Sequence, residues 1–264
     1  LRSRQVVNRD ICMISSSPCD LAALPHDEAR CILDTRCQLG EGPRWHAAEA
    51  RLYWVDIDRC ELWHWRPADG AMEKRGFDAP VACFAFRAGG GLLLGMQSGC
   101  ATIAAWDAPV RPFGPQPLAG RADHRMNDGR SDPAGRFWVG SVDSGKQAHD
   151  ATLYRLGADG ALAEIAGGML TCNGAAFSAD GRQFRHTDTP SHALRAYDCD
   201  PASGTLSNER LFHQFVPGTG RPDGGSFDAE GCYWSALFDG GRVVRLGPDG
   251  QLLQTVALPV SRPT

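Results

Sequence analysis

Lysine is scarce in this sequence: only two of its 264 residues are lysines, Lys74 and Lys146. The other basic residues are arginines dispersed along the chain, and the formal net charge is -4 at pH 7. Binding to nucleic acid or to an anionic membrane surface requires a concentrated patch of positive charge. The sequence therefore predicts neither kind of partner.

Long apolar runs are also lacking. No stretch approaches the roughly 20 apolar residues that a membrane-spanning helix needs. Basic residues occur near the beginning of the sequence, but no uninterrupted apolar segment of about 7–15 residues follows them, as a signal peptide would require. We therefore expect a cytoplasmic protein with no membrane partner.

Paired cysteines of the CxxC type are missing, although the chain contains ten cysteines. They lie at Cys12, Cys19, Cys31, Cys37, Cys60, Cys83, Cys100, Cys172, Cys199 and Cys232. Zinc sites need clustered ligands, and disulfide scaffolds are usually much shorter chains. This scatter predicts free and mostly buried thiols in a reducing compartment.

A sustained helical period is absent as well, and the density of Gly and Pro argues against helical repeats. What recurs instead is a turn with small or acidic residues and Gly, followed by a strand rich in aromatic or aliphatic residues. The five copies are HAAEARLYWVDI, RAGGGLLLGMQ, DPAGRFWVGSVD, SADGRQFRHTD and DAEGCYWSALFD. A second hairpin follows each copy, giving four strands per unit at a period of roughly 40–50 residues, which is typical of a β-propeller.

The repeats set the expected domain organisation. Residues 31–264 are predicted to form an all-β propeller domain, truncated at its C-terminal end because the fifth unit finishes close to Thr264. Residues 1–30 contain no repeat and are expected to form a disordered extension. In the third unit, we expect the innermost strand to begin at Phe137, with the polar residues 125–129 on a loop before it.

Polar residues beside Gly precede four of the five repeated turns. They lie in LGEGPRW (39–45), RMNDG (125–129), CNG (172–174) and PDGG (222–225). Any one of these pairs alone is typical of an ordinary turn. Their recurrence in four blades favours a shared site at the central channel, to which the blades contribute Glu41, Asn127, Asn173 and Asp223.

An all-oxygen set of this kind suits a hard divalent cation, Ca²⁺, Mg²⁺ or Mn²⁺, with water completing the shell. Zn²⁺ remains an alternative, although it usually takes His or Cys ligands. Arg125 could orient substrate oxygens with the help of Asn127, whereas Asp128 is expected to orient its neighbours. The chain has no GxSxG motif, so a serine nucleophile is unsupported, and His124 is expected to be an exposed surface residue rather than a general base.

The ordered motifs resemble the senescence marker protein/gluconolactonase/regucalcin-like family. The matching segments are LGEGPRW, LYWVDI, RMNDGRSDPAGRFWVGS, NGAAFSADG, YDCDPASGTLSNERLF and RPDGGSFDAEGCYW. The resemblance covers roughly residues 31 to 264. It implies a six-bladed β-propeller, which agrees with the incomplete last blade expected from the repeats.

The resemblance also implies a function and a site. It implies a metal-dependent hydrolase that opens sugar lactones such as gluconolactone. The implied metal ligands are Glu41, Asn173 and Asp223; the implied substrate-binding residues are Arg125 and Asn127. Asp223 is also the implied general base. Activation of the attacking water by the cation is the alternative mechanism.

Two departures from the family pattern lie in the fourth and the third repeat unit. Arg185 and His186 stand where relatives usually carry apolar residues, and buried polar groups there would need partners. The acidic residue that some members place soon after the first strand of the third blade has no clear counterpart, Asp143 being the nearest candidate. These departures leave the choice of substrate open. Because propellers host many non-enzymes and the last blade is expected to be incomplete, a non-catalytic calcium- or ligand-binding propeller is an alternative function. A phosphotriesterase-like hydrolase using the same cation is another, and the oligomeric state is open.

Overall fold

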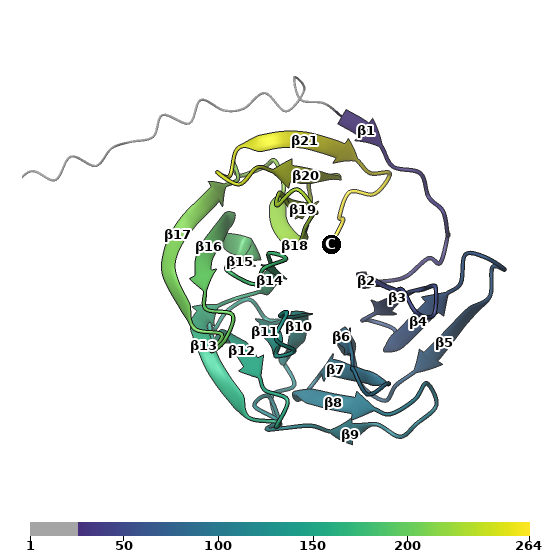
Figure 1. Cartoon of the computed structure of the whole chain (residues 1–264). Coiled ribbons are helices and arrows are strands. Elements are labelled where there is room, and N and C mark those ends of the chain that lie inside the picture. The colour runs from purple at the N-terminus through teal and green to yellow at the C-terminus, as the bar shows by residue number, and fades with distance from the viewer. Residues whose placement is uncertain (1–25) are drawn as a thin grey trace, which may run out of the picture.

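The computed structural model describes residues 26–264 as five sheets, each built on an antiparallel four-stranded meander, that stand radially around a common centre (Figure 1). The five sheets confirm the β-propeller, and their arrangement is consistent with a six-bladed ring in which one blade is incomplete. No helix in this part of the chain is both long and apolar enough to cross a membrane.

Each blade is a meander of consecutive strands. The first contains β2 (Gly40–His46), β3 (Arg51–Asp56), β4 (Glu61–Trp65) and β5 (Met72–Gly76). The second contains β6 (Val81–Phe86), β7 (Leu92–Met96), β8 (Cys100–Ile103) and β9 (Arg111–Pro112). The third contains β10 (His124–Ser131), β11 (Phe137–Asp143), β12 (Ala151–Leu156) and β13 (Leu162–Met169).

The fourth blade contains β14 (Cys172–Phe177), β15 (Gln183–Asp188), β16 (Ala193–Cys199) and β17 (Leu206–Gln214), with a short 3-10 turn, η2 (Thr189–Ser191), between β15 and β16. The fifth contains β18 (Arg221–Phe227), β19 (Tyr233–Phe238), β20 (Arg242–Leu246) and β21 (Leu252–Ala257). On the outside of this last blade, β1 (His26–Glu28) pairs with β21 in parallel. Residues 1–25 of the expected extension lie outside the described residues.

The repeated turn folds around one carboxylate. Asp132 accepts hydrogen bonds from the backbone N–H groups of Ala134 and Arg136, each at 3.0 Å, and from the indole N–H of Trp138 at 3.0 Å. Gly135 takes a φ of +84°, which suits glycine. The same turn recurs at Asp228, whose carboxylate accepts the indole N–H of Trp234 at 2.9 Å. The turn residues thereby fix where β11 and β19 begin.

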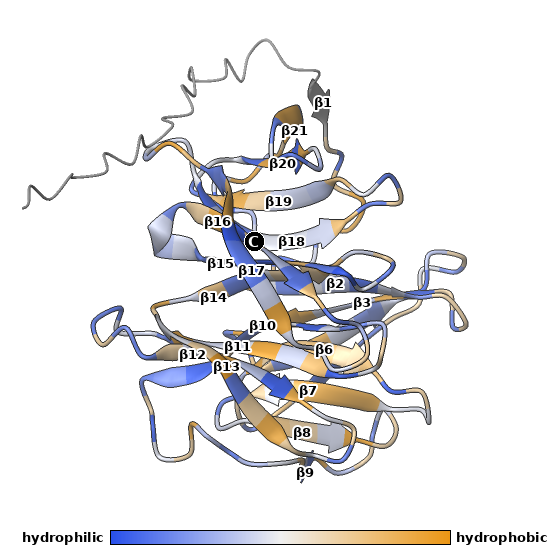
Figure 2. Ribbon diagram, turned by 60° about the vertical axis from the view of Figure 1, so that its left-hand side comes forward, coloured by the Kyte–Doolittle hydropathy of each residue, from blue (hydrophilic) through white to orange (hydrophobic). Residues whose placement is uncertain are grey.

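The apolar core lies between neighbouring blades rather than in one central mass. One cluster joins Cys83 of the second blade to Met126, Phe137 and Tyr154 of the third. Figure 2 shows the corresponding hydrophobic colouring of the strands. All eight cysteines in the described part of the chain are free, and five of them are buried, as the sequence predicts.

The structure corrects the position of the innermost strands. Phe137 begins the second strand of its blade, β11, and the innermost strand is β10, which starts at His124. Arg125 and Asn127 therefore lie on a strand and not on a loop. The prediction failed because the Asn, Asp and Gly residues of 127–129 are turn-forming types that here occupy a bulged strand.

Candidate functional site

All five innermost strands carry a bulge near the channel, and in four of them it lies beside the predicted polar residues. In each of these four, one extra residue interrupts the pairing with the second strand. The bulges fall between Glu41 and Arg44, Met126 and Gly129, Asn173 and Ala176, and Pro222 and Gly225. A β-bulge re-aims side chains and bends the strand. The Asn-Gly and Asp-Gly pairs are therefore parts of strands, and their interpretation as ordinary turns is wrong.

The bulged strands bring three of the predicted residues into one hydrogen-bonded row. The amide of Asn127 donates to Oδ1 of Asn173 at 2.8 Å, and the amide of Asn173 donates to Oδ1 of Asp223 at 2.9 Å. All three side chains are buried, and the row spans β10, β14 and β18. The two pairs in direct contact are separated in the sequence by 46 and by 50 positions.

Arg125 extends this row on β10. Its guanidinium donates to Oδ1 of Asn127 at 2.6 Å and to the backbone oxygen of Met126 at 2.9 Å. Burial lowers the pKa of Arg125, and the negative charge of Glu41 opposes that shift. Asp128 accepts the backbone N–H of Ala175 at 3.1 Å and so ties β10 to β14, in agreement with a role in orienting its neighbours.

The two carboxylates of the site carry unfavourable negative charge. Burial raises the pKa of Glu41 well above its ordinary value, and the charge of Asp223 raises it further. Burial, followed by the charge of Asp128, raises the pKa of Asp223 to about 7. Acidic groups in this condition bind a cation favourably, because the cation supplies the positive charge that the surroundings lack.

All five predicted residues line one cavity of about 160 Å³. Its remaining lining residues are Leu39, Val142, Lys146, Thr171, Thr189, Pro190, Arg221, Phe238 and Thr264. Thr189 links two elements of this wall, since its hydroxyl accepts from the Asn173 amide at 2.9 Å and donates to the backbone oxygen of Pro222 at 2.8 Å. Lys146, Thr171 and Thr189 were missed from the sequence because loop residues between strands carry no repeated signal.

A second group of potential ligands lies at the start of β10. Asp123, His124 and Asp143 offer one ligand atom each within 4.8 Å of one another, which makes a potential metal site. Both ring nitrogens of His124 already have carboxylate partners, Asp123 at 2.8 Å and Asp150 at 2.6 Å. Burial lowers the pKa of His124, but hydrogen bonds to these two carboxylates outweigh it, so that the pKa is raised overall.

His124 is fully buried, and its expected exposure on a loop is wrong because the two carboxylates hold it at the start of a strand. Asp143, the nearest candidate for the missing acidic residue, does not line the cavity. Its carboxylate accepts the backbone N–H groups of Gly145, Gln147 and Ala148 at 2.7–2.8 Å. Asp143 therefore shapes the loop after β11.

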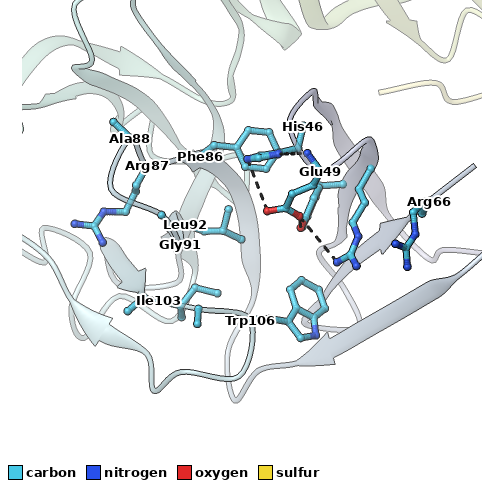
Figure 3. Close-up of a pocket in the computed structure, with 15 residues that line it drawn as sticks. His46, Glu49, Arg66, Phe86, Arg87, Ala88, Gly91, Leu92, Ile103 and Trp106 are labelled. Carbon is cyan, nitrogen blue, oxygen red and sulfur yellow. Dashed lines mark hydrogen bonds and ion pairs between the residues drawn. The ribbon is translucent and has the colours of Figure 1, made fainter.

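A larger hollow lies elsewhere, between the first two blades. It has a volume of about 760 Å³ and includes His46, Glu49, Phe86 and Trp106, which Figure 3 shows around its wall. His46 ends β2 and Phe86 ends β6, whereas Glu41 lies at the start of β2. This groove is therefore at the opposite end of the strands from the converging polar row, and none of the predicted site residues reaches it.

Comparison with known proteins decides the family. Residues 39–264 match the family described as SMP-30/Gluconolactonase/LRE-like region. A 6-deoxy-6-sulfogluconolactonase from Pseudomonas putida is 38% identical over 241 residues, covering 90% of this chain and 82% of that protein. This chain belongs to the SMP-30/gluconolactonase/regucalcin family. Membership groups it with lactonase-family hydrolases.

Other members of the family extend the comparison. Regucalcin from Oryctolagus cuniculus is 32% identical over 240 residues, covering 89% of this chain and 80% of that protein. A solved gluconolactonase from Xanthomonas campestris has a TM-score of 0.71 at 26% identity, covering 84% of this chain and 77% of that one. A structure of a calcium-binding protein, regucalcin, from Agrobacterium tumefaciens has a TM-score of 0.87 at 24% identity, covering 92% of this chain and 82% of that one. At this identity the similarity supports the fold alone.

The residues of the channel site fit the divalent cation that membership in this family implies. Glu41 and Asp223 would offer carboxylate oxygens, and Asn127 and Asn173 would offer amide oxygens, each of which also accepts a hydrogen bond from Arg125 or Asn127. Oxygen donors with two carboxylates suit Ca²⁺, Mg²⁺ or Mn²⁺ better than Zn²⁺. Raised pKa values of both carboxyl groups are what a site built around a cation shows in the metal-free state.

Proposed function

We propose that this protein is a metal-dependent hydrolase of sugar lactones, of the gluconolactone class. The observation that carries the proposal is the convergence of Glu41, Asp223 and Asn173 with Arg125 in one cavity on the channel. A fixed guanidinium beside carboxylates that would hold a divalent cation suits a reaction in which negative charge develops on a carbonyl oxygen.

Hydrolysis forms one bond and breaks another at the same carbon. The water oxygen bonds to the lactone carbonyl carbon, and the ring C–O bond then breaks. The ring oxygen takes up a proton and becomes a hydroxyl group, while the new carboxylic acid ionises and releases one proton to solvent. The reaction needs a proton acceptor for the water and a stabilising group for the oxyanion.

The residues divide these tasks. Glu41, Asn173 and Asp223 would hold a divalent cation, which polarises the carbonyl and stabilises the oxyanion when bound. Asp223, which lies beside the place where the water would attack, is the group that takes the proton of that water. Arg125, held by Asn127 at 2.6 Å, orients the oxygen atoms of the substrate.

Proton release from a set of aldonolactones, measured at constant pH with and without a chelator, tests the proposal. We expect chelation to abolish turnover and Ca²⁺, Mg²⁺ or Mn²⁺ to restore it. Binding of a lactone without turnover under every metal condition would contradict the proposal and favour a non-catalytic binding propeller. Faster turnover of a phosphotriester than of any lactone would favour the phosphotriesterase alternative.

A further inference from the structure

We propose that Lys146 recognises an anionic substituent of the lactone, such as a sulfonate, phosphate or carboxylate group, and so sets the substrate class of the site. This inference rests on the proposed function, because it concerns the same cavity. The observation behind it is the distribution of charge among the groups that line the cavity.

Among the side chains that line this cavity, three are basic and two are acidic. Glu41 and Asp223 are its acidic residues, whereas Arg125, Lys146 and Arg221 are its basic ones. A divalent cation bound by the two carboxylates would neutralise them and leave the three basic side chains to be balanced by something else. A neutral sugar lactone offers no such balance, but a lactone with an anionic group does.

The positive charge of Arg221 is partly balanced by a neighbouring carboxylate. Arg221 forms a salt bridge with Asp239, and Arg262 binds the other oxygen of the same carboxylate at 2.8 Å. Two guanidinium groups therefore share one carboxylate beside the cavity, which leaves this edge with an excess of one positive charge.

The positive charge of Lys146 has no such carboxylate partner among the described residues. In the described part of the chain Lys146 makes no salt bridge, and its ammonium group donates to the hydroxyl group of Thr171, a neutral partner that also lines the cavity. Asp143, Asp188 and Asp223 act on Lys146 only from beyond ion-pair distance, and the carboxylate of Asp188 accepts the backbone N–H groups of Leu170 and Thr171, at 3.1 and 2.8 Å. The ammonium group keeps donors free for a ligand.

Backbone hydrogen bonds to Asp143 fix the loop that carries Lys146. The buried carboxylate of Asp143 accepts three backbone N–H groups on both sides of Lys146. Lys146 has a φ of +54°, a left-handed conformation that few non-glycine residues adopt. A loop fixed in this way places the ammonium group at the cavity before a ligand arrives, which reduces the entropy cost of binding.

The test compares three lactones that share the same ring: glucono-1,5-lactone, its 6-phosphate and its 6-deoxy-6-sulfonate. We expect the metal-loaded protein to have a kcat/KM at least about tenfold higher for an anionic lactone than for the neutral one. Lys146→Ala should reduce this ratio about tenfold, Lys146→Glu should bring it below one, and Lys146→Arg should retain most of it. Raising the ionic strength should weaken the preference of the unaltered protein, because partly exposed charges are screened.

Lys74, the second lysine of the chain, offers a matched control. It lies on β5 at the outer side of its blade and pairs with Glu61 at 2.7 Å, and Lys74→Ala should leave the ratio unchanged. Equal rates on neutral and anionic lactones, or an equal effect of Lys146→Ala on both, would overturn the inference while leaving the lactonase proposal intact.

Calorimetry separates the two proposals when turnover is lost. The open-chain acids gluconate and 6-deoxy-6-sulfogluconate would be titrated into the protein. Preferential binding of the sulfonate that Lys146→Ala weakens about tenfold would support the anion site even if no lactone were hydrolysed. Equal binding of the two acids would reject it.

Discussion

The side-chain amide of Asn173 donates a hydrogen bond to the carboxylate of Asp223 across 2.9 Å, joining β14 to β18 inside the channel. The contact brings an amide and a carboxylate of two neighbouring blades to the same point, where the metal ligands are proposed to converge.

Replacement of Asp223 by alanine should reduce kcat/KM on gluconolactone by about 10²–10⁴-fold, since it removes both a proposed ligand and the proposed proton acceptor. The circular dichroism spectrum should be unchanged. Asp249→Asn is a suitable control, because Asp249 lies in the exposed turn after β20 of the same blade, at the opposite end of the strands. Full activity of Asp223→Ala would rule out both roles.

Replacement of Arg125 by lysine should lower kcat/KM by roughly 10–100-fold, because lysine keeps the charge but loses the planar set of donors that contacts Asn127. Asn127→Ala should produce a smaller loss, expressed mainly in KM, because it frees the guanidinium without removing it. Initial rates over a range of substrate concentrations separate the two parameters. If Asn127→Ala instead weakens metal binding in calorimetry, Asn127 is a ligand and not only a positioning residue.

Metal binding should depend on pH through Asp223 and Glu41. Both carboxyl groups have raised pKa values in the metal-free protein, so each favours the folded state most at low pH, and the contribution of Asp223 is lost as pH rises through about 7. The contribution of these two groups should therefore make chelator-treated protein less stable at pH 8 than at pH 6. Added Ca²⁺ should raise the Tm by more at pH 8 than at pH 6. Differential scanning calorimetry of the protein and of Asp223→Asn checks this. The variant should gain stability without metal at pH 8 and lose the response to Ca²⁺.

His186 should destabilise the fourth blade in acid. It is buried in β15, its Nε2 has no hydrogen-bond partner among the described residues, and burial lowers its pKa to about 4. Because the unfolded chain takes up a proton near pH 6.5 and the folded one only near 4, stability falls as pH drops through this window. His186→Leu should raise the free energy of unfolding by about 1 kcal/mol at pH 7 and by more at pH 5. His149→Asn, at an exposed loop position, is the control, and urea titrations at the two pH values measure the difference.

Gly174 should be intolerant of alanine. Its φ is +66°, and an added Cβ would lie 2.6 Å from the hydroxyl oxygen of Tyr233 and 3.0 Å from the backbone oxygen of Asp223. Gly231 has a φ of +79° but open space around it, so Gly231→Ala carries the backbone penalty alone, about 1 kcal/mol. Gly174→Ala should cost more stability than Gly231→Ala and should also reduce activity, because Asn173 precedes it. Equal losses of stability for the two variants would mean that the atoms around Gly174 shift to accommodate the added Cβ.

Much of the fold could be predicted from the sequence because the turn around Asp132 and Asp228 repeats with its Gly and its aromatic strand. The position of the innermost strand could not, since residues 127–129 have the composition of a turn and become strand only when β11 and β14 pack against them.

The site could be predicted where its residues recur at one position in several blades, as Glu41, Asn173 and Asp223 do. Lys146 could not, because its place in the cavity depends on the backbone hydrogen bonds of Asp143, which no sequence pattern marks. Arg185 was expected to need partners. It donates to Gln183 at 2.8 Å and lies over the ring of Phe212 at 4.1 Å, while its Nε has no partner among the described residues.

At the four bulges beside the polar residues, the side chains of the proposed site are placed outside the strand pairing that holds the blades together. The ladders between second, third and fourth strands hold each blade together, whereas the bulged residues have left the regular pairing of the innermost strand. A side chain exchanged at a bulge alters the channel without removing a rung from those outer ladders. New substrate preferences can therefore arise in such a ring by changing a few inward-facing residues, while the blades keep their architecture.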